Sequence, residues 1–150
     1  AGLASEADLA ARRSWYFSLI DLLKVRARTI DDIVRQAIPY LNDGIDYDPD
    51  AIAKTWKDAA ASRDALKATR DALAGAPAWE PQPLEDSLRS LAESRGTAAG
   101  KIFQPLRLAL TGVTASPGIF DVLVMLGRER SLARIDAAVQ FLDENRAARR

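Results

Sequence analysis

Apolar residues recur along most of the chain at helical spacing, and the apolar–polar alternation that is typical of strands is nearly absent. Alanine, leucine and arginine are frequent throughout. The pattern therefore predicts an all-α protein. Its clearest helical face lies between residues 30 and 41, at Ile30, Ile33, Val34, Ala37, Ile38 and Leu41.

Residues that favour helix ends divide this pattern into segments. Pro39 is expected to end or bend its helix, and Pro105 to kink or delay the helix over residues 101–110. The first helix is expected to point Leu9, Tyr16, Leu19, Ile20 and Leu23 inward. Expected starts are Ser5 with Asp8, Thr29 with Asp32, Asp48 with Pro49, Ser62, Ser116 with Pro117, and Ser131; expected stops are Gly75, Gly96 and Gly127.

The stretch from Ala76 to Pro83 interrupts the helical pattern with three prolines and Trp79. We therefore expect two packed helical subdomains, residues 1–76 and 77–150. Trp15, Trp56 and Trp79 are spaced as core anchors and not as a platform for stacked bases.

Histidine and cysteine are both absent from the chain. A structural zinc site, a disulfide and the common catalytic triads therefore lack their usual residues, although carboxylate or lysine chemistry stays open. This composition favours a binding or structural module, and no cofactor is expected in this chain.

Charge is unevenly distributed although the formal net charge is zero. Lys and Arg number 12 against 16 Asp and Glu up to Ser94, and 9 against 5 from Arg95 onward. The basic second part could face an anionic partner, or the asymmetry could be a chance property of a solvated surface. No apolar run is long enough to span a membrane and no basic leader precedes residue 8, so we expect a cytoplasmic protein.

Three segments in the C-terminal third form a recognisable series: GKIFQPLRLALTG at 100–112, SPGIF at 116–120 and LGRERSLARI at 126–135. In order and spacing they resemble the C-terminal signature of bacterial glutamyl-tRNA synthetases, and residues 24–33 and 47–56 resemble segments of the same family's first anticodon-binding subdomain. The resemblance implies that both predicted subdomains form the family's helical anticodon-binding cage.

This resemblance also implies the partner, the tRNA for glutamate, with neither DNA nor a membrane involved and with a monomer expected. The family's catalytic half is missing from the sequence, because neither its histidine-bearing adenylate motif nor its lysine–serine loop is found. ATP and magnesium are therefore implied only for a parent enzyme, a glutamate–tRNA ligase. The chain alone is not expected to activate glutamate.

Arg26 corresponds to a family arginine that reads the last anticodon base and separates glutamate from glutamine tRNAs. A guanidinium offers donors and no acceptor, so it suits the O2 and N3 acceptors of an unpaired cytosine. Guanine would oppose it with its own donors, at a cost of about 1–3 kcal/mol per unsatisfied polar group. The alternative is a surface ion pair of Arg26 with Asp21 or another carboxylate.

The resemblance also places Arg107, Ser116, Pro117 and Ile119 against the anticodon. Arg107 could instead cover apolar neighbours with its stem, and Ser116 with Pro117 could simply cap a helix. In the reading that the resemblance implies, this helix start contacts the first anticodon bases. Its free backbone N–H groups bind acceptor atoms, and the proline and the aliphatic side chain support a base. Lys101, Arg128, Arg130 and Arg134 are interpreted as solvated charges or sequence-blind contacts to the RNA backbone.

Two other functions stay open from the sequence. A stand-alone helical interaction protein could retain the synthetase C-terminal fold, and the zero net charge permits it. An independent enzyme ranks last because the chain offers no evident nucleophile or base.

Overall fold

The computed structural model describes residues 13–25, 27–42, 44–114 and 116–148, with side chains described to residue 144. Over these ranges the chain forms helices and no strand, which confirms the all-α prediction. The helices are α2 (Arg13–Lys24), α3 (Ile30–Leu41), α4 (Pro49–Thr55), α5 (Ala59–Ala74), α6 (Pro81–Ser94), α7 (Gly100–Thr111), α8 (Ile119–Leu126) and α9 (Arg128–Ala148).

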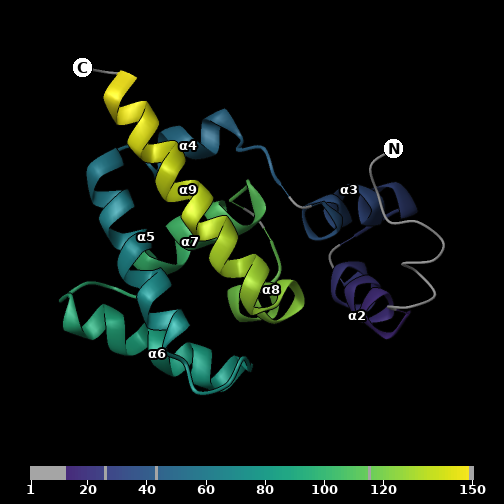
Figure 1. Ribbon diagram of the computed structural model, residues 1–150. Helices are drawn as coiled ribbons and strands as arrows, with labels where there is room; N and C mark the ends of the chain where they lie inside the picture. The colour runs from purple at the N-terminus through teal and green to yellow at the C-terminus, as the bar shows by residue number, and fades with distance from the viewer. Residues whose placement is uncertain (1–12, 26, 43, 115, 149–150) are drawn as a thin grey trace.

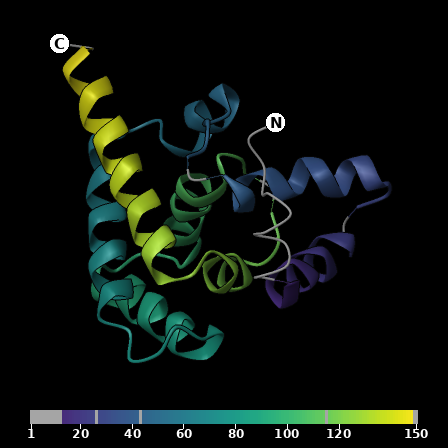
Figure 2. The same ribbon diagram turned by 45° about the vertical axis from the view of Figure 1, so that its right-hand side comes forward.

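Two parts of unequal size make up the molecule (Figure 1). Helices α2 and α3 pack against each other as a hairpin at one side, where α2 contacts α8 and α3 contacts α7. The larger part is built around α9, which packs along α5, while α6 and α7 also contact α5. Figure 2 shows α5 and α9 side by side and the hairpin on the far side of α7 and α8.

The predicted boundary between residues 76 and 77 falls within the larger part. Helix α5 precedes the boundary and α6 and α9 follow it, yet α5 packs on both. The division into subdomains 1–76 and 77–150 stays a prediction, and in the structure it is the α2–α3 hairpin that stands apart (Figure 1).

The three tryptophans anchor the helices to one another. Trp56 is buried, whereas Trp15 and Trp79 are partly buried against the same core. Each indole N–H donates to a backbone carbonyl: that of Trp15 to Met125 and that of Trp79 to Leu123 at 2.7 Å, and that of Trp56 to Pro105 at 3.4 Å. The predicted core role is thus confirmed for Trp56, and the other two tie the edge of the core together.

The predicted inward face of α3 is wrong in part. Ile30 is 78% exposed and Val34 and Ile38 are exposed too, while Ala37 and Tyr40 are buried. The physical reason is that the main neighbours of α3 in the described structure are α2 and α7. They cover one strip of its surface, and the apolar face is wider than that strip. On α2, Leu19 and Leu23 are buried as predicted, but Ile20 is exposed and Tyr16 is half-buried.

Side-chain caps confirm two of the predicted helix starts. The Thr29 hydroxyl accepts a hydrogen bond from the Asp32 N–H at 3.1 Å, and the Asp48 carboxylate accepts one from Ala51 at 3.2 Å. The predicted glycine stops are confirmed as well: Gly75 and Gly127 are the C-caps of α5 and α8, and Gly96 follows Arg95, the C-cap of α6. The start at Ser5 and the inward residue Leu9 lie outside the described residues.

Other predicted boundaries are wrong. Asp58 caps α5 by accepting from the Ala61 N–H at 3.1 Å, so Ser62 falls inside the helix. Ser131 is buried within α9, which begins at Arg128. The late start considered for α7 at Pro105 is also wrong, because that helix begins at Gly100 and contains Pro105; the alternative, a kink at Pro105, stays a prediction.

Candidate nucleic-acid interface

Asp32 organises the turn between α2 and α3. Its carboxylate accepts a hydrogen bond from the Arg28 backbone N–H at 3.1 Å and pairs with the Arg35 guanidinium. The hydrogen bond from Arg28 and the charge of Arg35 lower the pKa of Asp32 below its ordinary value.

Arg26, the predicted base reader on this turn, lies outside the described residues. Its suggested alternative partner, Asp21, forms an ion pair with Lys24 at 2.9 Å.

Arg107 on α7 and Ser116 on the loop after α7 contact each other directly. The Arg107 Nε donates to the Ser116 Oγ at 2.9 Å, and its Nη1 donates to the Gln104 Oε1 at 3.3 Å. Ser116 in turn donates to the Pro117 carbonyl at 2.8 Å. These bonds fix the plane of a half-buried guanidinium, so two of the residues that the sequence singled out form one unit.

The expected helix cap at Ser116 is wrong. Helix α8 begins at Ile119, Gly118 occupies the N-cap position, and no side chain caps it. The Ser116 hydroxyl accepts from Arg107 and donates to the Pro117 carbonyl. Capping therefore does not explain the Ser–Pro pair.

A cavity of about 330 Å³ lies between the hairpin and the α7–α8 loop. This volume falls in the range of roughly 300–1,000 Å³ that is usual for ligand pockets. Ser116 and Pro117 line one side of it, so the C-terminal motif series meets the α2–α3 hairpin here. The other lining residues are Leu23, Arg35, Gln36, Pro39, Tyr40, Thr111 and Val113.

Sequence analysis missed the two polar side chains that the hairpin brings to this cavity, Arg35 and Gln36. Arg35 is oriented by its ion pair with Asp32, and the exposed edge of a base suits its donors. The Gln36 amide offers both donors and an acceptor, and it has no hydrogen-bond partner within the described ranges. The sequence held one signal for Gln36: it lies one helical turn before Tyr40, so the two side chains share a face of α3 that differs from the face with Ile30 and Ile38.

The remaining predicted contacts, Pro117 and Ile119, differ in their surroundings. Pro117 lines the cavity, whereas Ile119 is only 4% exposed and belongs to the core. A contact between Ile119 and a base stays a prediction. In the structure the buried Ile119 side chain packs in the core at the start of α8.

Three of the arginines interpreted as solvated charge bind the protein itself. Arg134 is buried, and its guanidinium donates to the carbonyls of Leu110 at 2.7 Å and Asn42 at 2.6 Å. Arg130 donates to the Asn42 carbonyl at 2.9 Å, and Arg128 donates to the carbonyl of Ala74. These side chains hold the end of α3 and the end of α5 onto α9, so their role is structural.

A search of the described residues for clusters of carboxylate, histidine or cysteine side chains that could hold a metal ion finds none. In the same part of the chain, no helix combines the length and the apolar character needed to cross a membrane.

Comparison with known proteins identifies the chain's relatives. Residues 3–139 match a family model described as an anticodon binding domain. The chain is 40% identical over 144 residues to a glutamate–tRNA ligase of Anaeromyxobacter sp. (strain K), covering 96% of this chain and 29% of that protein. It is 45% identical over 117 residues to glutamate–tRNA ligase 2 of Rhizorhabdus wittichii, covering 78% of this chain and 24% of that protein.

Solved structures agree with these relatives. A glutamate tRNA ligase from Elizabethkingia meningosepticum, crystallised with its amino acid, superposes with a TM-score of 0.77 at 26% identity, covering 89% of this chain and 27% of that one. The chain thus spans less than a third of the length of the relatives it matches. These relatives do not favour the alternative of a stand-alone interaction protein. The chain belongs to the anticodon-binding domain family and corresponds to the C-terminal part of glutamate–tRNA ligases.

Proposed function

We propose that this chain binds the anticodon loop of the glutamate tRNA on behalf of a glutamate–tRNA ligase. The observation that carries the proposal is the cavity that Ser116 and Pro117 share with the hairpin residues Arg35 and Gln36. A loop of unstacked bases needs such a site, because single-stranded RNA is read by splaying bases into pockets and bonding their edges. Family membership and the glutamate–tRNA ligase relatives support the choice of RNA.

Each residue receives a role from its chemistry. Pro117 supports the face of a base, and the Arg107–Ser116 pair presents a fixed guanidinium to acceptor atoms or to phosphate. Gln36 reads a base edge, since its amide can both donate and accept. Arg26 reads the last anticodon base, a cytosine in glutamate tRNAs, as the family resemblance implies.

Glutamate activation and transfer belong to a catalytic part joined to this region in a parent enzyme, which would use ATP and magnesium in the cytoplasm. The anticodon-binding region then selects the tRNA, while the chemistry takes place at a distance.

The test is Arg26→Gln in a full-length ligase that carries this chain, with the charging rates of glutamate and glutamine tRNAs measured side by side. Loss of the guanidinium should reduce the preference for the glutamate tRNA by about tenfold to a hundredfold, the equivalent of one or two mispaired donors. Arg28→Gln is the matched control, because Arg28 is exposed on the same turn and its side chain makes no bond within the described ranges. An unchanged preference in Arg26→Gln refutes the role of Arg26.

A further inference from the structure

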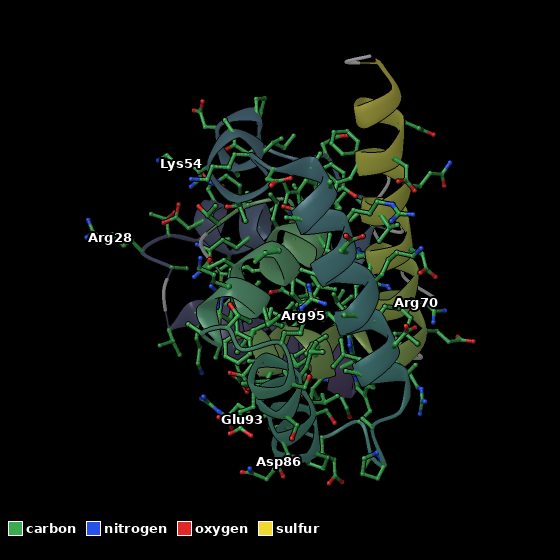
Figure 3. The ribbon with its side chains drawn as sticks, turned by 90° about the vertical axis from the view of Figure 1, so that its left-hand side faces the viewer. Arg28, Lys54, Arg70, Asp86, Glu93 and Arg95 are labelled. Atoms are coloured by element: carbon green, nitrogen blue, oxygen red, sulfur yellow. The ribbon has the colours of Figure 1, made fainter. Side chains whose placement is uncertain are left out.

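A second cavity, of about 720 Å³, opens where the α4–α5 corner faces the first half of α7. We call this cavity the basic groove, because the described residues that line it include four cations: Lys54, Lys57, Arg95 and Lys101. Among the described residues that line it, the carboxylate is that of Asp58, which accepts a hydrogen bond from the Ala61 N–H as the N-cap of α5. Figure 3 shows Lys54 and Arg95 on one face of the molecule, with Asp86 and Glu93 toward the α6 end.

The four cations of the basic groove are unpaired. Throughout the described ranges none of them makes an ion pair or a side-chain hydrogen bond. Other cations of the same structure do have partners: Lys24, Arg35, Arg63, Arg70 and Arg89 each pair with a carboxylate. Positive charge that is gathered in a cleft and left without counter-charge raises the local concentration of anions.

Trp56 joins two sides of the groove. This residue is 2% exposed, it lies between Lys54 and Lys57 in the sequence, and its indole N–H donates to the Pro105 carbonyl of α7. The α4–α5 corner, which carries Lys54 and Lys57, is therefore bonded to α7, which carries Lys101. Helices α5 and α7 both begin at this groove, and the positive ends of their dipoles add to the potential.

A chain of hydrogen bonds links the lining of the basic groove to Ser116 of the first cavity. Gln104 lines the groove and accepts a hydrogen bond from Arg107, which is bonded to Ser116 in turn. Thr114 lines the groove from the α7–α8 loop, close in sequence to Ser116. Uncharged polar side chains, among them Thr55, Thr97 and Gln104, line the groove together with the cations and suit sugar hydroxyls and phosphate oxygens.

We propose that the basic groove binds the phosphate backbone of the RNA strand that enters or leaves the anticodon cavity. This inference rests on the proposed function for the identity of the RNA. The groove supplies affinity that is blind to sequence, and the cavity at Ser116 supplies the reading of bases. An acidic protein segment would also suit the charge, but the bonds that link Gln104 of the groove through Arg107 to Ser116 of the base cavity favour RNA.

The experiment titrates the chain with two synthetic RNA hairpins, one carrying the glutamate anticodon loop and one the same stem with a loop of adenines. Affinity is measured by fluorescence anisotropy at about 50 and 200 mM salt. The variant is Lys57→Gln with Lys101→Gln. Its matched control is Lys67→Gln, since Lys67 is exposed and unpaired on α5 but does not line the groove.

Each lost phosphate contact should reduce the salt slope by about 0.7. The fourfold rise in salt should therefore cost the wild-type chain about sevenfold more affinity than it costs the double variant. The loss should be the same for both RNAs, Lys67→Gln should behave as wild type, and arginine at both positions should restore the slope.

An unchanged slope and affinity in the double variant overturn the groove proposal, including the case in which the groove serves an acidic protein. Equal binding of the two RNAs by the wild-type chain instead contradicts the reading of the anticodon, while the slope still tests the groove. Absence of binding to either RNA at the lower salt concentration contradicts both proposals.

Discussion

Gly112 closes α7 at a point where the chain cannot carry a side chain. Its φ is +80°, in the left-handed region that favours glycine, and a Cβ at this position would stand 2.1 Å from the Asp46 carbonyl oxygen. The Gly112 carbonyl also accepts a hydrogen bond from the Asp48 N–H at 2.8 Å. The residue thus joins the end of α7 to the segment before α4, next to Thr111 and Val113 of the cavity.

Gly112→Ala should reduce the free energy of unfolding by about 2–5 kcal/mol, since the strain of a left-handed alanine adds to a backbone clash. Gly96→Ala is the matched control, because Gly96 has φ of +62° but no atom within 4 Å of the added Cβ. That variant should lose only about 1–2 kcal/mol, the cost of the conformation alone. Denaturant unfolding of both variants measures the difference, and equal losses would exclude the clash.

The candidate site was predictable at the level of single residues only where a motif carried it. Arg107, Ser116 and Pro117 were found from the C-terminal signature, and the structure places them together. Their local geometry was not predictable, because Ser–Pro is a common helix start and nothing in the sequence shows that Arg107 takes the hydroxyl. Gln36 carries no motif, so only the fold reveals its position at the cavity.

At the scale of elements, the turn between α2 and α3 depends on one ionised carboxylate. Asp32 accepts from the Arg28 N–H and pairs with Arg35, and its own N–H bonds to the Thr29 hydroxyl. Because folding lowers the pKa of Asp32, its contribution to stability is present at neutral pH and is lost as the pH falls through that lowered value.

We therefore expect the hairpin to loosen in acid before the larger part does. An NMR titration of the Asp32 carboxyl carbon should give a midpoint below the ordinary aspartate range, and the Arg28 amide signal should move with the same midpoint. Asp32→Asn removes the charge at all pH values, so its Arg28 amide should show no such transition. A midpoint at or above the ordinary range would contradict the lowered pKa.

Helix starts were predictable only where a side chain caps the helix within one turn, as at two of the predicted starts. Thr29 and Asp48 cap their helices through contacts within three residues, and such local chemistry is visible in the sequence. The exposed side of α3 was not visible, because it is decided by which helices lie beside it. Ile30 and Val34 satisfy the spacing of a buried face, yet α2 and α7 cover the strip with Ala37 and Tyr40 instead.

At the scale of the whole molecule, the hairpin is joined to the larger part by a few specific ties. Trp15 of α2 donates to the Met125 carbonyl of α8, and Arg134 of α9 bridges the carbonyls of Asn42 and Leu110. Asn42 is the C-cap of α3, where a cation also complements the helix dipole. The cavity lies between the two parts, so its shape depends on these ties.

Arg134→Gln should reduce the free energy of unfolding by about 2–4 kcal/mol, since two charge-assisted hydrogen bonds are lost and the buried Leu110 carbonyl is left without this donor. Arg128→Gln, which removes an exposed arginine from the same helix, should lose about 1 kcal/mol or less.

Hydrogen exchange of the α3 amides should accelerate in Arg134→Gln more than exchange in α5, because the hairpin loses its tie while the α5–α9 packing persists. The same variant separates the two RNA sites. Its preference for the glutamate anticodon loop should fall as the cavity loosens. Its salt slope should stay at the wild-type value, because none of the described residues that line the basic groove belongs to the α2–α3 hairpin or to α9. If preference and slope fell together, the cavity and the groove would have to be one site.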